Sequence, residues 1–471
     1  MSEARQARPG SADEATQGTE ARRRERRWTE ASIWTERMVS ALVNGVKAWP
    51  RAGRRLDPWG GKWFSLIDKV YRPSTLAAAW TRVERNKGAA GVDGQGIERF
   101  AAQAERYLTE LHEQLKDGSY RPAPVKRVEI PKGDGKTRPL GIPTVQSLPR
   151  AKAGDRVVQT ALKLAIEPVF EAQFRPGSYG FRPGRSCKAA LREVDRLLKA
   201  GYSFVVDADL KSYFDTIPHD RLISRVADAI SDGRILALIE GLPAAGHHEG
   251  HGAMAPDHGH APRGGHLPLL ANIYLHPLDL LMEESGYRMV RYADAFVILC
   301  RTEDEAMAAL RQAEAWVTEN GLTLHPDKTR IGDSRHPGQG FDFLGYRFEA
   351  GYRFVRKKSR NAFKSLPPAK AGDKVRAKTG RGRGVSLGRI ITDLNPMLRG
   401  WFGYFQYVVP SELRALDGFI RRRLRAVLRK QEKRPGLGRN LDDHQRWPNA
   451  FFAEHGLFTL TTAHYHARHS R

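Results

Sequence analysis

Two aspartates stand in or beside apolar, strand-like runs that lie far apart in the sequence. Asp294 belongs to the tetrad Tyr-Ala-Asp-Ala at 292–295, which separates two apolar runs and has the form of a hairpin turn. Asp209 lies near the end of a similar run at 203–210. A carboxylate on a hairpin tip and a second one on another strand are suited to hold the two divalent ions of phosphoryl transfer. Ala295 occupies the position at which a further acid would complete the hairpin.

The composition of the chain predicts a polyanionic partner. Its 471 residues include 78 Lys and Arg against 53 Asp and Glu, a formal charge of +25. Many basic groups together favour nucleic acid, because they neutralise phosphates and release counterions. A membrane surface is the competing polyanion, but no stretch approaches the roughly 20 apolar residues of a spanning helix, and no basic-then-apolar signal peptide opens the chain. We therefore expect a cytoplasmic protein that binds nucleic acid and does not associate with membranes.

The length of the chain allows two or three domains with well-buried cores. It contains only two cysteines, Cys187 and Cys300, far apart in sequence. A cytosolic chain of this size does not need a disulfide. We expect two free, mostly buried thiols.

Basic side chains gather near the tip of a predicted hairpin at 124–145. The two strand-like runs flank a Gly-Asp-Gly turn, and Lys132, Lys136 and Arg138 lie around it. One interpretation is a solvated basic hairpin. The other is a clamp on the incoming triphosphate or on the template.

Two further segments combine cations with rings or apolar residues. In the first, Tyr179 and Phe181 alternate with Arg182 and Arg185, an arrangement suited to backbone phosphates and base stacking. The second is a predicted helix near the end of 386–435, whose arginines recur around the whole helix among apolar residues. One face of that helix is expected to pack and the other to meet solvent or nucleic acid.

The order of the predicted elements indicates an α+β fold. A strand at 203–210 is followed by helices at 218–230 and 267–284, a hairpin at 287–301 and a helix at 303–320. This β-α-α-β-β-α order favours an antiparallel sheet with helices on one face. Helices at 155–171 and 187–199 come before it, the second capped by Ser186.

Several segments together resemble the reverse transcriptase–maturase proteins encoded by bacterial group II introns. The resemblance runs from about residue 86 to residue 405 and includes several specific motifs at once. The segments that carry it are Asn86–Gly94, Arg138–Pro143, Ser178–Pro183, Tyr292–Phe296, Leu324–Thr329, Phe341–Tyr346 and Leu394–Phe405.

The resemblance implies a right-hand polymerase, with fingers and a palm built on an antiparallel sheet, followed by an α-helical thumb or maturase domain. Asp209 and Asp294 would be catalytic and would bind two Mg²⁺ ions together with the backbone carbonyl of Leu210. Ala295 marks a lost ligand position. The implied partners are structured intron RNA, an RNA template with a DNA primer, and deoxynucleoside triphosphates.

The same resemblance suggests roles for residues outside the metal site. Phe214 would lie beneath the deoxyribose and exclude a 2′-hydroxyl, and Lys328 would lie near the primer or nucleotide phosphates. Lys132 and Arg138 complete the expected nucleotide contacts. The expected RNA contacts are Arg182, Arg185, Arg399, Trp401, Arg421, Arg422 and Arg425.

The predicted domains combine the changes in composition along the chain with what the resemblance implies for 86–471. They are a disordered basic tail at 1–27, a helical extension at 28–85, fingers and palm at 86–363, a basic linker at 364–385, the thumb or maturase domain at 386–435, and a tail without an endonuclease module at 436–471.

The segment 241–267 departs from the family pattern. Six of the 16 histidines fall there, which allows three interpretations: a metal site, a flexible polar loop, or an out-of-frame translation. The residues 259–268 have a possible coding sequence that, shifted by one base, reads Gly-Thr-Pro-Gln-Gly-Ala-Val-Ile-Ser, similar to the segment that the family has before Leu-Leu-Ala-Asn. We therefore expect 241–267 to be out of frame, and the nucleotide sequence of the gene tests this.

Three functions follow from these observations. The first is an RNA-directed DNA polymerase that also assists splicing and mobility of its intron, with activity impaired by Ala295 and by 241–267. The second is an RNA-binding maturase without polymerase activity, because RNA binding needs only charge, rings and shape. The third is a degenerate, non-functional copy.

Overall fold

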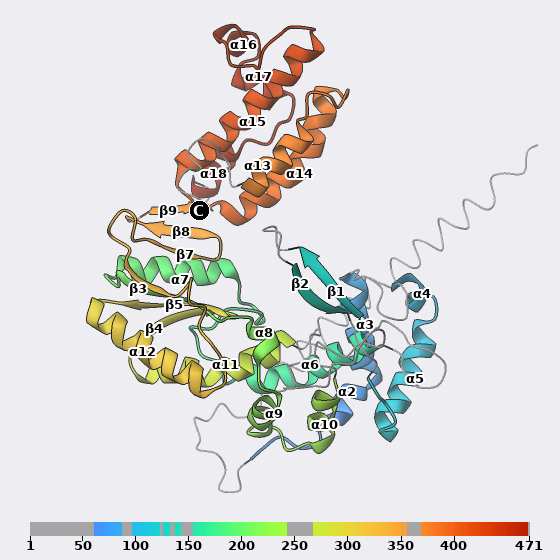
Figure 1. Cartoon of the computed structure of the whole chain (residues 1–471). Coiled ribbons are helices and arrows are strands. Elements are labelled where there is room, and N and C mark those ends of the chain that lie inside the picture. The colour runs from blue at the N-terminus through green and yellow to red at the C-terminus, as the bar shows by residue number, and fades with distance from the viewer. Residues whose placement is uncertain are drawn as a thin grey trace, which may run out of the picture. The chain divides into compact units, whose positions relative to one another are not determined.

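The computed structural model describes residues 61–86, 97–122, 126–131, 137–142, 154–242, 267–350, 352–355 and 369–469 (Figure 1). The chain divides into two compact units. One comprises 1–174 and 214–275, and the other comprises 175–213 and 276–471. Segment 243–266 lies outside the described residues, so its out-of-frame origin stays a prediction.

The first unit is mainly helical. Its central helix is α6 (Asp155–Glu171), which packs against α3 (Pro73–Arg85) and α2 (Ile67–Tyr71). The predicted bounds of α6 are confirmed. The other elements of this unit are α4 (Ile97–Ala101), α5 (Ala104–Asp117), α9 (His219–Ala227), α10 (Gly233–Gly241) and the hairpin β1 (Lys126–Pro131) with β2 (Thr137–Ile142).

The hairpin β1–β2 is antiparallel, with Lys126 opposite Ile142 and Pro131 opposite Thr137. Its strands therefore confirm the predicted hairpin. The tip at 132–136, which includes Lys132, lies outside the described residues. Arg138 lies within β2.

The second unit contains a four-stranded antiparallel sheet in the order β4-β5-β3-β6. The strands are β3 (Phe204–Asp209), β4 (Arg288–Tyr292), β5 (Ala295–Cys300) and β6 (Arg330–Asp333). This confirms the α+β fold with an antiparallel palm sheet.

Helices cover both faces of this sheet, so the expectation of helices on one face is wrong. Helix α7 (Cys187–Lys199) packs against Val205, Val297 and Leu299. Helix α12 (Glu303–Glu319) contacts β3, β5 and β6 from the opposite side (Figure 1). The prediction failed because α7 precedes the first palm strand and was not counted in the element order. Ser186 caps α7 as expected, accepting a hydrogen bond from Ala189 N at 3.2 Å.

A second, three-stranded antiparallel sheet follows. Its strands are β7 (Phe341–Phe343), β8 (Tyr346–Glu349) and β9 (Tyr352–Val355). Aromatic residues of this sheet share one hydrophobic core with α7 and with the helices beyond it. The phenol of Tyr346 donates a hydrogen bond to Tyr404 O at 2.5 Å, and the phenol of Tyr404 donates one to Leu344 O at 2.7 Å.

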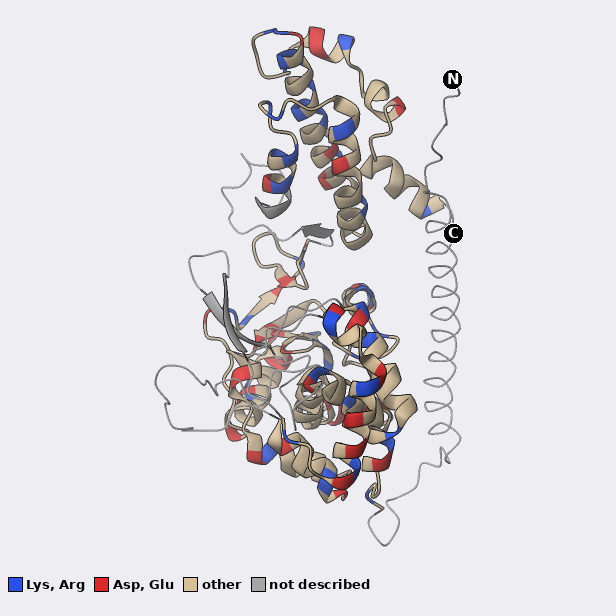
Figure 2. Cartoon of the chain, turned by 90° about the vertical axis from the view of Figure 1, so that its right-hand side faces the viewer, with Lys and Arg blue, Asp and Glu red and all other residues tan. Residues whose placement is uncertain are grey.

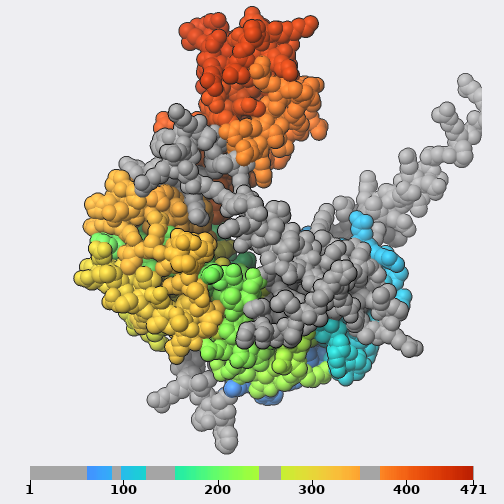
Figure 3. Space-filling model, viewed as in Figure 1, coloured from blue at the N-terminus to red at the C-terminus, as the bar shows by residue number. Residues whose placement is uncertain are grey.

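The C-terminal part of this unit is helical beyond the predicted limits. Its helices are α13 (Ala369–Lys378), α14 (Leu387–Phe405), α15 (Pro410–Gln431), α16 (Leu441–Arg446), α17 (Asn449–Glu454) and α18 (Leu460–His469). Two predictions are therefore wrong: 364–385 is not only a linker, because it contains α13, and 436–471 is not a tail. Trp447, Phe452 and Leu460 are buried against α14 and α15, and α15 and its neighbours form one continuous body (Figure 3).

Basic residues recur along α14 and α15, and acidic residues are interspersed with them (Figure 2). None of the helices among the described residues combines the length and the apolar composition needed to cross a bilayer. Cys187 and Cys300 are free thiols, as expected; Cys300 is buried and Cys187 is partly exposed.

Candidate active site

Asp209 and Asp294 come together because β3 pairs with β5. In the antiparallel register Asp209 lies opposite Ala295, the residue after Asp294. Leu210 N donates a hydrogen bond to Asp294 O at 3.2 Å, so the end of β3 is tied to the β4–β5 turn. The pairing places two carboxylates, 85 residues apart in sequence by their numbers, at one end of one sheet.

The electrostatics of Asp294 show that the two carboxylates interact. Burial raises the pKa of Asp294, and the negative charge of Asp209 raises it further, while Lys328 and Arg291 act in the opposite direction. Two neighbouring acids of this kind disfavour each other's ionisation. A cation between or beside them would relieve that repulsion.

Lys328 supplies one such cation. Its ammonium nitrogen lies 2.5 Å from Asp209 Oδ2, and the lysine side chain is 48% exposed. The preceding loop is fixed to β3, since His325 N donates to Asp209 O at 2.7 Å and Lys211 N donates to Thr323 O at 2.9 Å. The predicted Lys328 is therefore brought to the candidate site, at a carboxylate.

Ala295 stands at the place where a third carboxylate would matter. Residues directly opposite in an antiparallel pair project on the same face, and Ala295 is opposite Asp209. A carboxylate at 295 would therefore lie beside Asp209. Within the described residues, no group of three or more His, Cys, Asp or Glu side chains is arranged to hold a metal ion.

The turn that carries Asp294 is short, and the side chain of Arg291 binds its backbone. Ala293 has a φ of +60°, a left-handed conformation that is unfavourable for any residue other than glycine. The Arg291 guanidinium donates from Nη1 to Ala293 O at 3.0 Å. Sequence reasoning missed Arg291, although an arginine inside an apolar strand was an available signal.

Arg291 is itself fully buried and paired. Its Nε and Nη2 donate to the two carboxylate oxygens of Asp279 at 2.7 and 2.5 Å, and Nη2 also donates to Ser178 Oγ at 2.8 Å. Burial alone would lower the pKa of Arg291, but the charge and hydrogen bonds of Asp279 raise it. The pair is a charge-neutral, bidentate contact in the interior.

The segment 177–182 lies directly against β4. Arg291 N donates to Gly177 O at 2.9 Å, and Tyr179 N donates to Arg291 O at 2.8 Å. The contact is so close at Gly180 that a Cβ there would meet Ala293 N at 2.4 Å. This segment therefore supports the turn that carries Asp294.

Arg182 has a structural position within this segment. It is 7% exposed, and its Nη1 donates to Arg175 O and Ser178 O at 2.7 and 2.8 Å. Its guanidinium thus binds carbonyl groups of its own loop, and the expected contact of Arg182 with RNA stays a prediction. The residues around it, 177–182, pack against the turn that carries Asp294.

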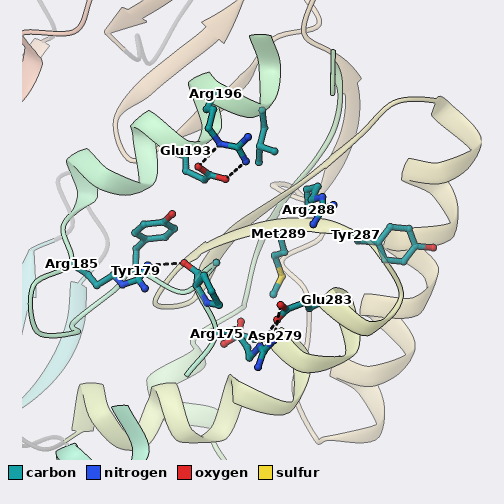
Figure 4. Close-up of a pocket in the computed structure, with 13 residues that line it drawn as sticks. Arg175, Tyr179, Arg185, Glu193, Arg196, Asp279, Glu283, Tyr287, Arg288 and Met289 are labelled. Atoms are coloured by element: carbon teal, nitrogen blue, oxygen red, sulfur yellow. Dashed lines mark hydrogen bonds and ion pairs between the residues drawn. The ribbon is translucent and has the colours of Figure 1, made fainter. Parts of the chain in front are cut away.

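Arg185 faces a cavity of about 270 Å³ between this loop, α7, α11 (Leu267–Glu284) and β4 (Figure 4). Its guanidinium lies 5.1 Å from the centre of the Tyr179 ring and donates to Pro176 O at 2.7 Å. The other charges of the cavity include two ion pairs, Arg175–Glu283 and Arg196–Glu193.

The remaining nucleotide residue, Phe214, lies in the short helix α8 (Tyr213–Thr216) and is half-buried. Among the predicted RNA contacts of the C-terminal helices, Arg399 lies 5.6 Å from the Phe458 ring and Trp401 lies 4.8 Å from the Phe405 ring. Arg421 and Arg422 are half-buried on α15.

Arg425 does not belong with these residues. It is 2% exposed, its Nε donates to Trp447 O at 2.9 Å and its Nη2 donates to Asn449 Oδ1 at 3.0 Å. The side chain ties α15 to the chain at 447–449, and the expected RNA contact by Arg425 stays a prediction.

The comparisons with known proteins agree with this geometry. Residues 130–348 match the family described as "Reverse transcriptase (RNA-dependent DNA polymerase)", and residues 369–447 match "Group II intron, maturase-specific domain". The chain is 35% identical over 337 residues to Protein YkfC of Escherichia coli (strain K12), covering 63% of this chain and 84% of that protein.

Two further similarities are partial. The chain is 37% identical over 218 residues to the group II intron-encoded protein LtrA of Lactococcus lactis subsp. cremoris, covering 45% of this chain and 34% of that one. A solved partial Cas6-RT-Cas1–Cas2 complex is similar over 54% of this chain and 41% of that chain, at 24% identity and a TM-score of 0.33.

Proposed function

The chain belongs to the group II intron reverse transcriptase–maturase family, and from this premise we propose that it catalyses RNA-templated DNA synthesis at Asp209 and Asp294. The observation that carries the proposal is the β3–β5 register, which sets Asp209 beside the turn of Asp294. The proposed substrates are an RNA template with a DNA primer and deoxynucleoside triphosphates. The proposed RNA partner is a structured intron, whose splicing and mobility the protein assists.

The residues present fit a Mg²⁺ site. Asp209 and Asp294 are oxygen donors of the kind that Mg²⁺ prefers, and the raised pKa of Asp294 reflects its burial and the repulsion that a cation would offset. The Leu210 carbonyl is proposed as a further ligand. The chemistry that such ions supply when bound is activation of the attacking oxygen and stabilisation of the leaving oxygen.

The protein's own residues have positioning and electrostatic roles in this proposal. Lys328, whose ammonium contacts Asp209, is free to swing toward a primer or nucleotide phosphate because its side chain is half exposed. Phe214, Lys132 and Arg138 are the other proposed nucleotide contacts. Preorganised charges of this kind are worth several kcal/mol where charge develops in phosphoryl transfer.

Ala295 is proposed to limit the rate. A carboxylate at 295 would lie on the same face as Asp209. Without it, two carboxylates bind the proposed Mg²⁺ ions more weakly than three would. The loss corresponds to several kcal/mol in transition-state stabilisation, by order of magnitude. Polymerisation by the natural chain is therefore expected to be slow.

Primer extension tests the proposal. The natural chain and its Ala295→Asp variant are compared on an RNA template with a DNA primer, in Mg²⁺ and in Mn²⁺, with Ala295→Asn as the matched uncharged control. We expect extension by Ala295→Asp at least tenfold faster than by either other chain. Equal rates for all three would reject the role of Ala295, and no extension by any chain would leave a maturase that only binds RNA.

RNA binding is proposed to involve the cations that remain accessible. They are Arg185, Arg399, Arg421 and Arg422, with Trp401 as a stacking surface. Filter binding to structured intron RNA across a salt series measures this. Arg421→Gln with Arg422→Gln should reduce the slope of log affinity against log salt by about 1 to 2. Glu412→Gln, at a half-buried position on the same helix, should not.

A further inference from the structure

We propose that Arg291, together with Asp279 and Ser178, is a positioning residue that fixes the turn carrying Asp294. This inference rests on the proposed function, because it concerns how one of the two metal-binding carboxylates is aimed. Arg291 also interacts electrostatically with Asp294, whose pKa it lowers. It acts through the peptide that precedes Asp294.

The contact with the turn includes a hydrogen bond of ordinary length. Nη1 of Arg291 lies 3.0 Å from Ala293 O, and that carbonyl belongs to the peptide joining Ala293 to Asp294. The plane of this peptide sets the direction in which the Cα–Cβ bond of Asp294 leaves the chain. A donor beneath the carbonyl therefore controls where the carboxylate points.

The turn needs such a restraint because its backbone is strained. Ala293 has a φ of +60°, and a residue with a Cβ adopts that conformation only when its surroundings impose it. Flipping the Ala293–Asp294 peptide would change ψ of Ala293 and φ of Asp294 and would therefore re-aim the Asp294 side chain. The hydrogen bond from Arg291 and the backbone packing of Gly180 both oppose that flip.

The guanidinium is in turn held so that it cannot move away. Its side chain is 0% exposed and that of Asp279 is 3% exposed. Asp279 accepts two hydrogen bonds from it in the bidentate geometry, and Ser178 Oγ accepts a third. A planar guanidinium bound on two edges has one orientation, so the third edge is directed at Ala293 O.

The same helix offers a natural comparison. Asp279 and Glu283 are one turn apart on α11, and each pairs with an arginine. The Glu283–Arg175 pair is exposed, at 42% and 39% of the two side chains, and no hydrogen bond of Arg175 reaches the 292–295 turn among those the structure shows. We call the contact of Ser178, Asp279 and Arg291 the brace. Glu283→Gln therefore removes an ion pair from α11 without changing any residue of the brace.

The test separates positioning from folding by replacing both charges at once. Removing one partner of a buried pair leaves an unpaired charge, but replacing both by apolar residues of similar volume is often tolerated. We would introduce Asp279→Leu with Arg291→Met into the full-length Ala295→Asp chain. The readouts are Mn²⁺ binding followed by electron paramagnetic resonance, the thermal midpoint, and kcat and KM for the nucleotide in primer extension.

We expect the double variant to remain folded but to bind Mn²⁺ at least tenfold more weakly and to lose about 100-fold in kcat, with KM changed less than threefold. Glu283→Gln should stay within twofold of its parent in every readout. Ser178→Ala, a milder change that deletes one hydrogen bond, should weaken Mn²⁺ binding three- to tenfold. If the double variant does not fold, the Mn²⁺ affinity of Ser178→Ala tests the positioning role instead.

The outcomes distinguish this inference from the proposed function. A folded double variant, or a Ser178→Ala variant, with the Mn²⁺ affinity and kcat of an active parent would overturn the brace alone. A parent that neither extends a primer nor shows Mn²⁺ binding sensitive to Asp294→Asn would overturn the proposed function, and the brace with it.

Discussion

Arg291 in the palm sheet and Arg425 in helix α15 are both almost completely removed from solvent, but their charges are compensated differently. Arg291 is bound on two edges by the carboxylate of Asp279. Arg425 is bound by neutral acceptors, Trp447 O and Asn449 Oδ1. Asp279 raises the pKa of Arg291, whereas burial and the nearby Arg421 lower the pKa of Arg425.

The difference relates to what each region is proposed to do. A guanidinium paired with a carboxylate holds geometry while contributing less to the local field than an unpaired one, which suits the support of two carboxylates that are proposed to bind cations. A guanidinium held by neutral groups adds positive charge to its domain, which suits a surface that meets RNA phosphates. Two almost fully buried arginines can therefore differ in how much positive charge they add to their surroundings.

The largest expected effect separates chemistry in the palm from binding by the helices. Asp294→Asn in the Ala295→Asp chain should lower primer extension about 1,000-fold, because one of the few ligands of the proposed cations loses its charge. Affinity for structured RNA, measured by filter binding, should change less than twofold. A parallel fall in RNA affinity would show that the two regions do not divide the work as proposed.

Arg425→Met tests the other side of the comparison. The variant leaves Trp447 O and Asn449 Oδ1 without their charged donor, and we expect the free energy of unfolding to fall by about 3 kcal/mol. Denaturant unfolding measures it, with the exposed Arg414→Met on the same helix as control, expected to stay within about 0.5 kcal/mol. Lower RNA affinity at unchanged stability would instead make Arg425 an RNA contact.

Asp207 is a third buried charged residue, and the nearby Arg330 offsets its negative charge only in part. Burial raises the pKa of Asp207 to about 6, although Arg330 opposes the rise; the closest approach of that pair is 3.6 Å. A folded-state pKa above the unfolded value of 3.8 means that folding favours the protonated acid. The associated stability is present below the unfolded pKa and is lost as pH rises through about 6.

Asp207→Asn should therefore gain stability relative to the natural chain as pH rises from 4 to 7, by roughly 2 to 3 kcal/mol. Thermal unfolding of both chains across that range measures the difference. Asp195→Asn, which removes a surface pair with Lys199, is the control and should change stability by less than about 1 kcal/mol at either pH. A pH-independent difference for Asp207→Asn would contradict the assignment.

The smallest expected effect compares two glycines. A Cβ at Gly180 would meet Ala293 N at 2.4 Å, whereas one at Gly400 in α14 would meet nothing within 4 Å. Gly180→Ala should cost about 2 kcal/mol, because backbone must move, and Gly400→Ala should stabilise its helix by about 0.5 to 1 kcal/mol. Chemical unfolding of both variants checks this, and a neutral Gly180→Ala would show that the turn is not tightly packed.

Much of the fold was accessible from local sequence patterns. The bounds of α6, α7 and α11 were predicted to the residue, because each has a clear helical period and two are preceded by Gly or Ser. The palm hairpin was recognised from its alternation of apolar residues and turn residues. Short elements such as β6 and α10 were missed, since four to nine residues carry little periodic signal.

The site was accessible only in part. Asp209, Asp294 and Lys328 were identified from motifs, and the structure brings them together. Arg182 was assigned to RNA because it alternates with aromatic residues, and Arg425 because it belongs to an Arg-rich helix. Their burial depends on which carbonyls the fold places around them, and no local pattern contains that information.

The sequence by itself determined the reacting groups and the strands that carry them, because side-chain chemistry and hydrophobic alternation are local properties. It also predicts that Ala295 marks a lost ligand position. Tertiary structure decided which charged side chains are exposed to solvent and which are buried in contacts within the protein. The brace joins Ser178, Asp279 and Arg291 from a loop, a helix and a strand, and desolvation, which makes such a contact rigid, arises only when those segments pack together.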